Sequence, residues 1–403
     1  AIYGTSTYPV TYQVLEMISE TFALFMLVVT TFYAGELVWR EREARMAPML
    51  DVMPVPTWVR MLAKVFALIG LQALMLFVLM LCGLLIQMFN GYFVFELGLY
   101  VKTLFLIQLP QYALIAVLAI ALQVLFNHKY VAYFAMILYY VATITFDTLG
   151  LDHPMVLYGT SPDFVYSAMN GFGHYLARER WFQLYWGGAA LMLLVLTLVF
   201  WPRGCNDELG SRMRLARRNL SGPVLASFAL GLAIFAGAGS LLYFNLHVAN
   251  DFHTAWQDEQ QRAEYEQRYK PLAALAQPRV TSVDLKVDIM PEQRSLSVRG
   301  TYQLENRSGR PVTDIMVNQD RRAAIGLRFS QPARRAIADR ERGVYVYKLA
   351  TPLAPGARIA MAFDVGYAPK GVLGLGLDTP VVGNGTFFNK DALPSIGYLR
   401  SAE

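Results

Sequence analysis

Six long apolar stretches fill most of the first 250 residues, and they restrict the possible folds of this chain more than any other feature. They cover residues 15–38, 61–89, 101–126, 130–149, 181–201 and 223–246. A helix needs about 20 mostly apolar residues to cross the roughly 30 Å hydrocarbon layer of a membrane. Lipid offers no hydrogen-bond partners to the backbone, so spanning segments of this kind are helical. The sequence therefore predicts an α-helical polytopic membrane bundle of about six transmembrane helices.

Lys and Arg residues gather in every second loop between these stretches. They are Arg40, Arg42, Arg45, Arg60 and Lys64 after the first stretch, Lys129 (beside His128) after the third, and Arg203, Arg212, Arg214, Arg217 and Arg218 after the fifth. Cytoplasmic loops of membrane proteins carry an excess of Lys and Arg. We therefore expect these loops in the cytosol, and the N-terminus and all residues after Asn250 on the outer face. Since the basic residues cluster at helix ends, the net charge of +5 predicts no nucleic-acid partner.

The composition changes near Asn250, where the long apolar runs stop. Residues 251–270 are rich in charged and polar side chains, which indicates a solvated helical stalk. From residue 283 apolar and charged residues alternate with a period of two, as in β-strands. Further strands are expected at 296–304, 311–317, 325–329, 344–349 and 358–367. We expect an all-β antiparallel sandwich or saddle-shaped sheet.

The loop after the first apolar stretch combines an apolar set at helical spacing with a mixed-charge set. The apolar set is Met46, Met49, Leu50 and Met53, and the charged set is Arg40, Glu41, Arg42, Glu43 and Arg45. Pro54 and Pro56 follow. This pattern predicts one short amphipathic helix with a flexible methionine-rich face. Such a helix either lies on lipid headgroups or docks into a soluble cytoplasmic partner.

This loop resembles the signature of ABC-2 type exporter permeases. The resemblance is carried by Glu41-Arg42-Glu43, Arg45, Leu50, Pro54-Val55-Pro56 and Lys64. In that family the segment is a coupling helix that fits a groove on the ATP-binding subunit. The resemblance thus implies that an ATPase partner is bound by Glu41, Arg42, Arg45, Met46, Met49, Leu50 and Met53. It covers residues 15–202, including an outer loop at 151–180 that would match the family's outward helical hairpin, and the first family span is missing.

The same resemblance has consequences for cofactors and partners. The sequence contains no Gly-x-x-x-x-Gly-Lys-Ser/Thr phosphate loop, so ATP is expected on a separate chain. Exporters of this type need two permease halves, so either a homodimer or a second copy in the same chain is expected. The localisation implied is the bacterial inner membrane, with the β-domain periplasmic.

Glutamines lie inside the second and third predicted spans. Gln72 lies in the second span, and Gln108 and Gln111 flank Leu109-Pro110 in the third. One interpretation is a proline kink whose freed carbonyls, like the amides, bond to neighbouring helices. The other is the polar wall of a transport path formed by these three glutamines.

The tail resembles the N-terminal β-domain of aminopeptidase N-like zinc metallopeptidases. The matching segments are 279–300, Tyr302-Gln303-Leu304-Glu305-Asn306, Pro352–Gly356, Asn384–Asn389 and Leu393–Tyr398. It is similar in particular to large bacterial proteins in which an ABC-2 permease is fused to such a peptidase. The zinc motif of that family, His-Glu-x-x-His, does not occur here. We therefore expect no catalytic, metal or cofactor residue in this segment, and zinc only in a catalytic domain beyond it.

Together these patterns divide the chain into four parts. They are the permease bundle at 1–202, a basic loop and tether span at 203–249, the stalk at 250–278 and the exterior β-domain at 279–403. Because the chain starts at Ala1 and stops at Glu403 without a natural ending, we expect a segment of a longer protein. The leading hypothesis is the transmembrane subunit of an ABC exporter, with a peptide as the expected substrate. The alternatives are a membrane-anchored zinc aminopeptidase and an assembly scaffold.

Overall fold

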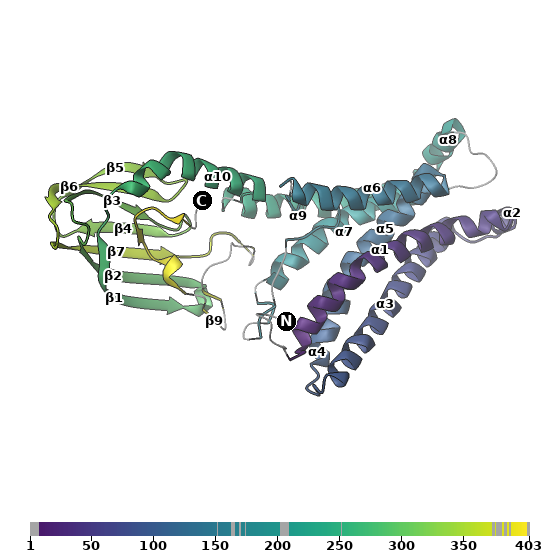
Figure 1. The fold of residues 1–403 in the computed structure, drawn as a ribbon. Helices are drawn as coiled ribbons and strands as arrows, with labels where there is room; N and C mark the ends of the chain where they lie inside the picture. The colour runs from purple at the N-terminus through teal and green to yellow at the C-terminus, as the bar shows by residue number, and fades with distance from the viewer. Residues whose placement is uncertain are drawn as a thin grey trace. The chain divides into compact units, whose positions relative to one another are not determined.

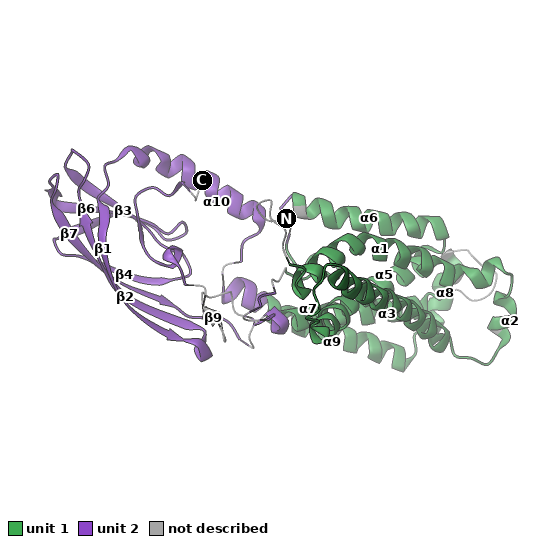
Figure 2. Cartoon of the chain, turned by 60° about the horizontal axis from the view of Figure 1, so that its bottom comes forward, with its two compact units in different colours: residues 1–148, 153–163, 178–242 green, residues 149–152, 164–177, 243–403 purple. Residues whose placement is uncertain are grey.

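The computed structural model describes residues 8–150, 152–162, 166–168, 171–173, 175–201, 209–250, 252–372, 375, 381–382, 385–386 and 388–400. Arg203 of the predicted basic loop and Asn384 of the matching tail segment lie outside these residues. Figure 1 shows the elements, and Figure 2 shows the two compact units into which the chain divides. The first unit comprises residues 1–148, 153–163 and 178–242, and the second comprises residues 149–152, 164–177 and 243–403.

The first unit is helical. Its elements are α1 (Thr11–Glu43), α2 (Ala47–Val52), α3 (Thr57–Phe89), α4 (Leu97–Val101), the π-helix η2 (Lys102–Gln108), α5 (Leu109–Phe126), α6 (Lys129–Thr148), most of α7 (Tyr175–Val199), α8 (Leu209–Asn219) and α9 (Gly222–Tyr243). Six helices are long and apolar enough to cross a membrane: Thr11–Glu43, Thr57–Phe89, Leu97–Phe126, Lys129–Phe146, Tyr175–Val199 and Gly222–Val248. This confirms the six predicted spans.

The bundle core lies where α1, α3 and the α4–α5 segment meet. Its buried members are Val14, Leu15, Ile18, Met26, Leu76, Leu79, Tyr100 and Leu104. Other apolar side chains of the same helices, such as Phe32 and Phe66, are exposed on the protein surface. Helices that are apolar all round are typical of membrane spans, because lipid replaces water around the exposed side chains.

A tight crossing between α7 and α9 depends on glycine. A Cβ atom added to Gly188 would lie 2.6 Å from the backbone nitrogen of Phe235 and 2.8 Å from the carbonyl oxygen of Gly231. Small residues let transmembrane helices approach closely, which gives the van der Waals contact that holds them together in lipid.

The second unit contains a β-sandwich. Its main strands are β1 (Arg279–Met290), β2 (Ser295–Glu305), β3 (Val312–Asn318), β4 (Ala324–Phe329), β5 (Ala333–Asp339), β6 (Val344–Leu353), β7 (Arg358–Tyr367) and β10 (Ser395–Ile396). One four-stranded sheet has the order β1-β2-β7-β4, the other has the order β10-β3-β6-β5, and β8 (Val381–Val382) pairs with β9 (Gly385–Thr386) in a small ribbon. All pairings are antiparallel. This confirms the predicted antiparallel β-domain.

Alternating inward residues of both sheets form the sandwich core. They include Leu296, Val298, Leu304, Ile315, Val317, Met361 and Phe363. The turn between β1 and β2 passes through Pro291 and a left-handed Arg294, and Gly356 before β7 has φ +79°.

The segment predicted as a stalk is helical, but it packs against the sandwich. Helix α10 (Ala255–Tyr269) starts with a capping box between Thr254 and Gln257. Tyr265 and Tyr269 on its inner face are buried against the sheet that contains β3 and β6 (Figure 1). In the described part of the chain, the π-helix η3 (Phe244–Val248) precedes it and the 3-10 helix η4 (Lys270–Ala274) follows it.

Candidate functional site

The end of α1 is fixed to three neighbouring elements by polar contacts. Lys64 Nζ of α3 lies 2.9 Å from Glu41 Oε1, and Lys129 Nζ of α6 lies 2.7 Å from Glu36 and 2.9 Å from Glu43. Arg42 donates to Asn127 Oδ1 at the end of α5, at 3.0 Å. These contacts join the last turns of α1 to α3, α5 and α6.

Arg45 ends α1 in a left-handed conformation, with φ +56°. The Arg45 N–H bonds to the Arg42 carbonyl at 2.9 Å, and the Met46 N–H bonds to the Glu41 carbonyl at 2.9 Å. This pair of bonds is a Schellman motif, which stops a helix and turns the chain. The prediction of one helix through the charged and apolar sets is therefore wrong: the charged set belongs to α1, and α2 is a separate short helix.

Helix α2 presents an apolar surface that no other part of the described chain covers. The exposed fractions are 52% for Met46, 70% for Met49, 86% for Val52 and 52% for Met53, while Leu50 is half-buried. Methionine side chains are unbranched and adaptable, which suits them to a surface that another protein contacts. Pro56 then sets the start of α3.

A second polar group lies inside the bundle, where α5 meets α7. Gln111 Nε2 is 3.0 Å from Glu179 Oε1 and 3.1 Å from Ser161 Oγ. Gln183 Nε2 also donates to Glu179 Oε1, at 3.1 Å. Glu179 is 4% exposed. Neither residue was predicted from the sequence: Glu179 fell in the outer loop expected at 151–180, and Gln183, inside the span expected at 181–201, was not singled out.

Gln72 and Gln108 join the helices of the first unit. Gln72 Nε2 donates to Thr30 Oγ1 at 2.9 Å and to the Tyr112 carbonyl at 3.0 Å, and Gln108 Nε2 donates to Ser19 Oγ at 2.9 Å. The interpretation of these amides as bonds between helices is therefore supported. The π-helix η2 ends at Gln108, two residues before Pro110.

The basic segment after α7 also contacts the bundle. Arg212 of α8 donates to the carbonyls of Val124 and Leu125, at 2.7 and 3.3 Å, at the end of α5. A cation at a helix C-terminus satisfies carbonyls that have no partner within the helix and interacts favourably with the helix dipole.

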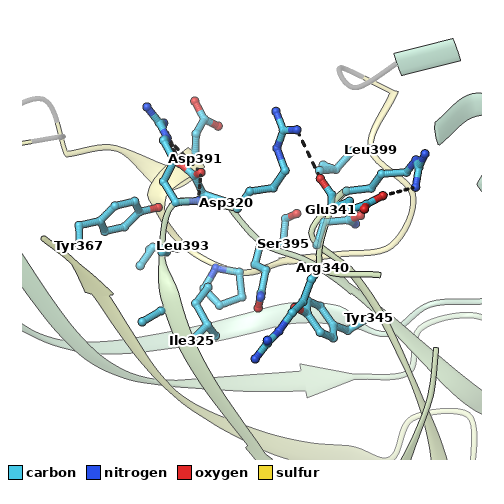
Figure 3. Close-up of a pocket in the computed structure, with 18 of the residues that line it drawn as sticks. Asp320, Ile325, Arg340, Glu341, Tyr345, Tyr367, Asp391, Leu393, Ser395 and Leu399 are labelled. Carbon is cyan, nitrogen blue, oxygen red and sulfur yellow. Dashed lines mark hydrogen bonds and ion pairs between the residues drawn. The ribbon is translucent and has the colours of Figure 1, made fainter. Parts of the chain in front are cut away.

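The second unit contains a cleft of about 1850 Å³, lined by α10, the β3–β4 loop, the β5–β6 turn and residues 390–399. Figure 3 shows Asp320, Tyr367 and Asp391 along one side and Arg340, Glu341 and Tyr345 along the other. Arg322 pairs with Asp320 at 2.7 Å. Within the described residues, no group of three His, Cys, Asp or Glu side chains could hold a metal ion.

An ion-pair cluster ties α10 to the β5–β6 turn. Asp339 Oδ2 accepts from Tyr269 Oη at 2.7 Å and from Arg342 Nη1 at 3.2 Å, and Arg342 also pairs with Glu264. Burial opposes the charge of Asp339, but these hydrogen bonds and the Arg342 charge outweigh it and lower the pKa of its carboxyl. Burial, together with the bond to Asp339, raises the pKa of Tyr269 to about 12.

Comparison with known proteins identifies the first part of the bundle. The family model for the ABC-2 family transporter protein matches residues 1–145. This segment is an ABC-2 transporter domain. The match includes α1, α2, α3 and α5, and therefore includes the exposed methionines and the three predicted path glutamines. With its six apolar helices, the protein is a multi-pass membrane protein and carries the membrane component of an ABC transporter. No curated protein and no solved structure matches the chain.

Proposed function

We propose that this chain is the transmembrane subunit of an ATP-driven exporter, and that α2 docks on a separate ATP-binding subunit. The observation that carries the proposal is the exposed methionine face of α2, placed directly after an α1 end that is bonded to α3 and α6. Closure of the ATPase would move α2, and the Glu41–Lys64 and Lys129 ion pairs would transmit that movement into the bundle.

The proposed roles of the residues in this loop differ from those that the sequence predicted. Glu41 and Arg42 are engaged inside the chain, with Lys64 and Asn127. Their proposed role is therefore to connect α2 to the bundle, while Met46, Met49 and Met53 supply the contact with the partner. Arg45 is exposed and gives the loop its turn.

Co-purification of the ATPase tests this proposal. The full chain carries an affinity tag, is expressed in its native host and is extracted in mild detergent; ATPase activity is then measured in the eluate. Met49→Glu puts a charge on the α2 surface and is expected to lower the recovered ATPase at least tenfold. Met88→Glu is the matched control, because Met88 is also exposed but lies at the opposite end of α3. Equal recovery with both variants would refute the docking site.

We propose that the exporter needs a second permease half, supplied by a second copy of this chain or by another copy in the same polypeptide. The bacterial inner membrane is the proposed location, with the β-domain on the periplasmic side. Support comes from the ABC-2 match and from the alternation of basic loops. A peptide is the proposed substrate, since the sandwich resembles a peptidase domain.

A membrane-anchored zinc aminopeptidase is the second candidate function. The two packed antiparallel sheets agree with the resemblance to an aminopeptidase N-type β-domain. The test is the gene sequence that follows Glu403: a His-Glu-x-x-His motif followed by a glutamate ligand would support this function. The absence of that motif from the parent gene would exclude it.

A further inference from the structure

Glu179 is a buried carboxylate with no cationic partner among the described residues. Among the residues that the structure describes, its hydrogen-bond partners are the side-chain amides of Gln111 and Gln183, and no ion pair reaches it. Amide donors stabilise a carboxylate but leave its negative charge in place. The other acidic side chains of the bundle described above, Glu36, Glu41 and Glu43, all pair with lysine at the end of α1. Glu179 therefore differs from these three glutamates, because its described partners are neutral amides and theirs are lysine ammonium groups.

The position of Glu179 makes this charge unusual. Glu179 is near the start of α7 (Tyr175–Val199), and its partner Gln111 lies at the middle of the helical segment Leu97–Phe126. A buried carboxylate in a membrane bundle is costly, and such residues face the bundle interior and mark substrate or ion pathways.

Buried hydrogen-bond acceptors without partners lie on the second and third spans. Gln72 Oε1 and Gln108 Oε1 are buried and have no hydrogen-bond partner within the described chain. Gln72 is 1% exposed and bonds through its nitrogen to the Tyr112 carbonyl, the residue after Gln111. The Ile107 carbonyl, at the π-helix, accepts from Gln183 at 3.4 Å. Unsatisfied acceptors require donors, and an ammonium group supplies three.

We propose that Glu179 recognises a positively charged amine on the transported substrate, with Gln111 and Gln183 holding its carboxylate in place. The inference rests on the proposed transport function and gives that function a substrate class. The amine would neutralise the buried charge, and its remaining N–H groups would bond to the acceptors on α3 and η2. A substrate without a cationic amine would leave both the charge and the acceptors unpaired.

A purely structural role for Glu179 makes a different prediction. Glutamine at position 179 has nearly the same shape and keeps an oxygen that can accept from Gln111 and Gln183. If Glu179 only joins α5 and α7, Glu179→Gln should therefore change nothing. If its charge binds an amine, the same substitution should abolish binding while the protein stays folded.

The test uses the full chain in detergent without its ATPase, so its outcome does not depend on α2 docking. The probes are leucyl-leucine amide, which carries one ammonium group, and its N-acetylated form, which carries none. The melting temperature is measured against probe concentration up to 10 mM. The wild type is expected to show a saturable increase with the amine probe only. Glu179→Gln should lose it, Glu179→Asp should keep part of it, and the control Glu16→Gln, an exposed glutamate of α1, should keep all of it.

Three results would overturn the proposal: an unchanged response in Glu179→Gln, an equal response to the acetylated probe, or no response of the wild type to either probe. Should Glu179→Gln not purify, the native protein provides a second measurement. A hydrophobic carbodiimide modifies buried carboxyls, and the peptide that contains Glu179 is quantified by mass spectrometry. Leucyl-leucine amide should lower this modification at least fivefold relative to the acetylated probe, and equal modification would contradict the assignment.

Discussion

Lys64 Nζ and Glu41 Oε1 are 2.9 Å apart, and this ion pair joins the two spans that flank the α2 loop. The Lys64 side chain is 10% exposed, and its ammonium also lies over the Trp201 ring. The Glu41 side chain is 37% exposed, so the pair connects the end of α1 to α3 with its lysine nearly buried and its carboxylate partly in water.

Glu41→Gln should destabilise the protein, because it leaves the Lys64 ammonium nearly buried without its counter-charge. Loss of one partner of a charged hydrogen bond costs about 1 to 3 kcal/mol. The melting temperature of the detergent-solubilised protein should fall, and the charge exchange Glu41→Lys with Lys64→Glu should recover part of it. Arg40→Gln serves as a control on the exposed side of the same turn. An unchanged melting temperature in Glu41→Gln would show that the pair contributes nothing.

Gly188→Ala should weaken the packing of α7 on α9. The added Cβ would meet the backbone atoms of Phe235 and Gly231, which can move away only if the helices separate. Overpacking of this kind costs about 1 to 3 kcal/mol. Gly187→Ala is the matched control, since a Cβ there has nothing within 4 Å. The measurement is the melting temperature of each variant, and a larger loss in Gly187→Ala would contradict the described helix crossing.

Acid should destabilise the second unit through Asp339. The pKa of the Asp339 carboxyl is lower in the folded protein than in the unfolded chain, where it is about 3.9. The contribution of Asp339 to the free energy of unfolding is therefore fully present above the pKa of the unfolded chain, and it is lost as the pH falls through the lower folded value. Calorimetric melting between pH 7 and pH 2 should therefore show a loss of stability below about pH 4. Asp339→Asn should lower the stability at pH 7 by about 1 to 3 kcal/mol and flatten this acid dependence. The exposed Asp364→Asn should behave as the wild type does, and an equal flattening there would contradict the role of Asp339.

Hydropathy and periodicity were sufficient to predict the six spans and most strands, because both depend only on the residues within each segment and not on contacts with the rest of the chain. Strand β5 was not predicted, since its sequence, Ala333–Asp339, contains Arg334 and Arg335 and shows little apolar alternation. It is an edge strand of its sheet, and charged side chains at an edge discourage pairing with other chains. The polar composition of α10 likewise concealed the burial of Tyr265 and Tyr269 against the sheet.

The candidate sites were harder to predict, because they depend on contacts between distant residues. Helical spacing of the methionines identified the apolar surface of the α2 loop, yet periodicity carries no information on the left-handed Arg45 that separates α2 from α1. Gln111 was identified as a polar residue within a span. Its carboxylate partner Glu179 lies 68 residues further along the chain, and only the packing of α5 against α7 brings the two together.

Cysteine accessibility in intact cells tests the central claim most directly, namely that α2 faces the cytosol and the β-sandwich faces the exterior. Single cysteines replace the exposed residues Met49 and Asp284 in a chain whose Cys82 and Cys205 are changed to serine. A membrane-impermeant maleimide should label position 284 in intact cells and position 49 only after permeabilisation. Labelling of position 49 from outside, or protection of position 284 until permeabilisation, would contradict this account.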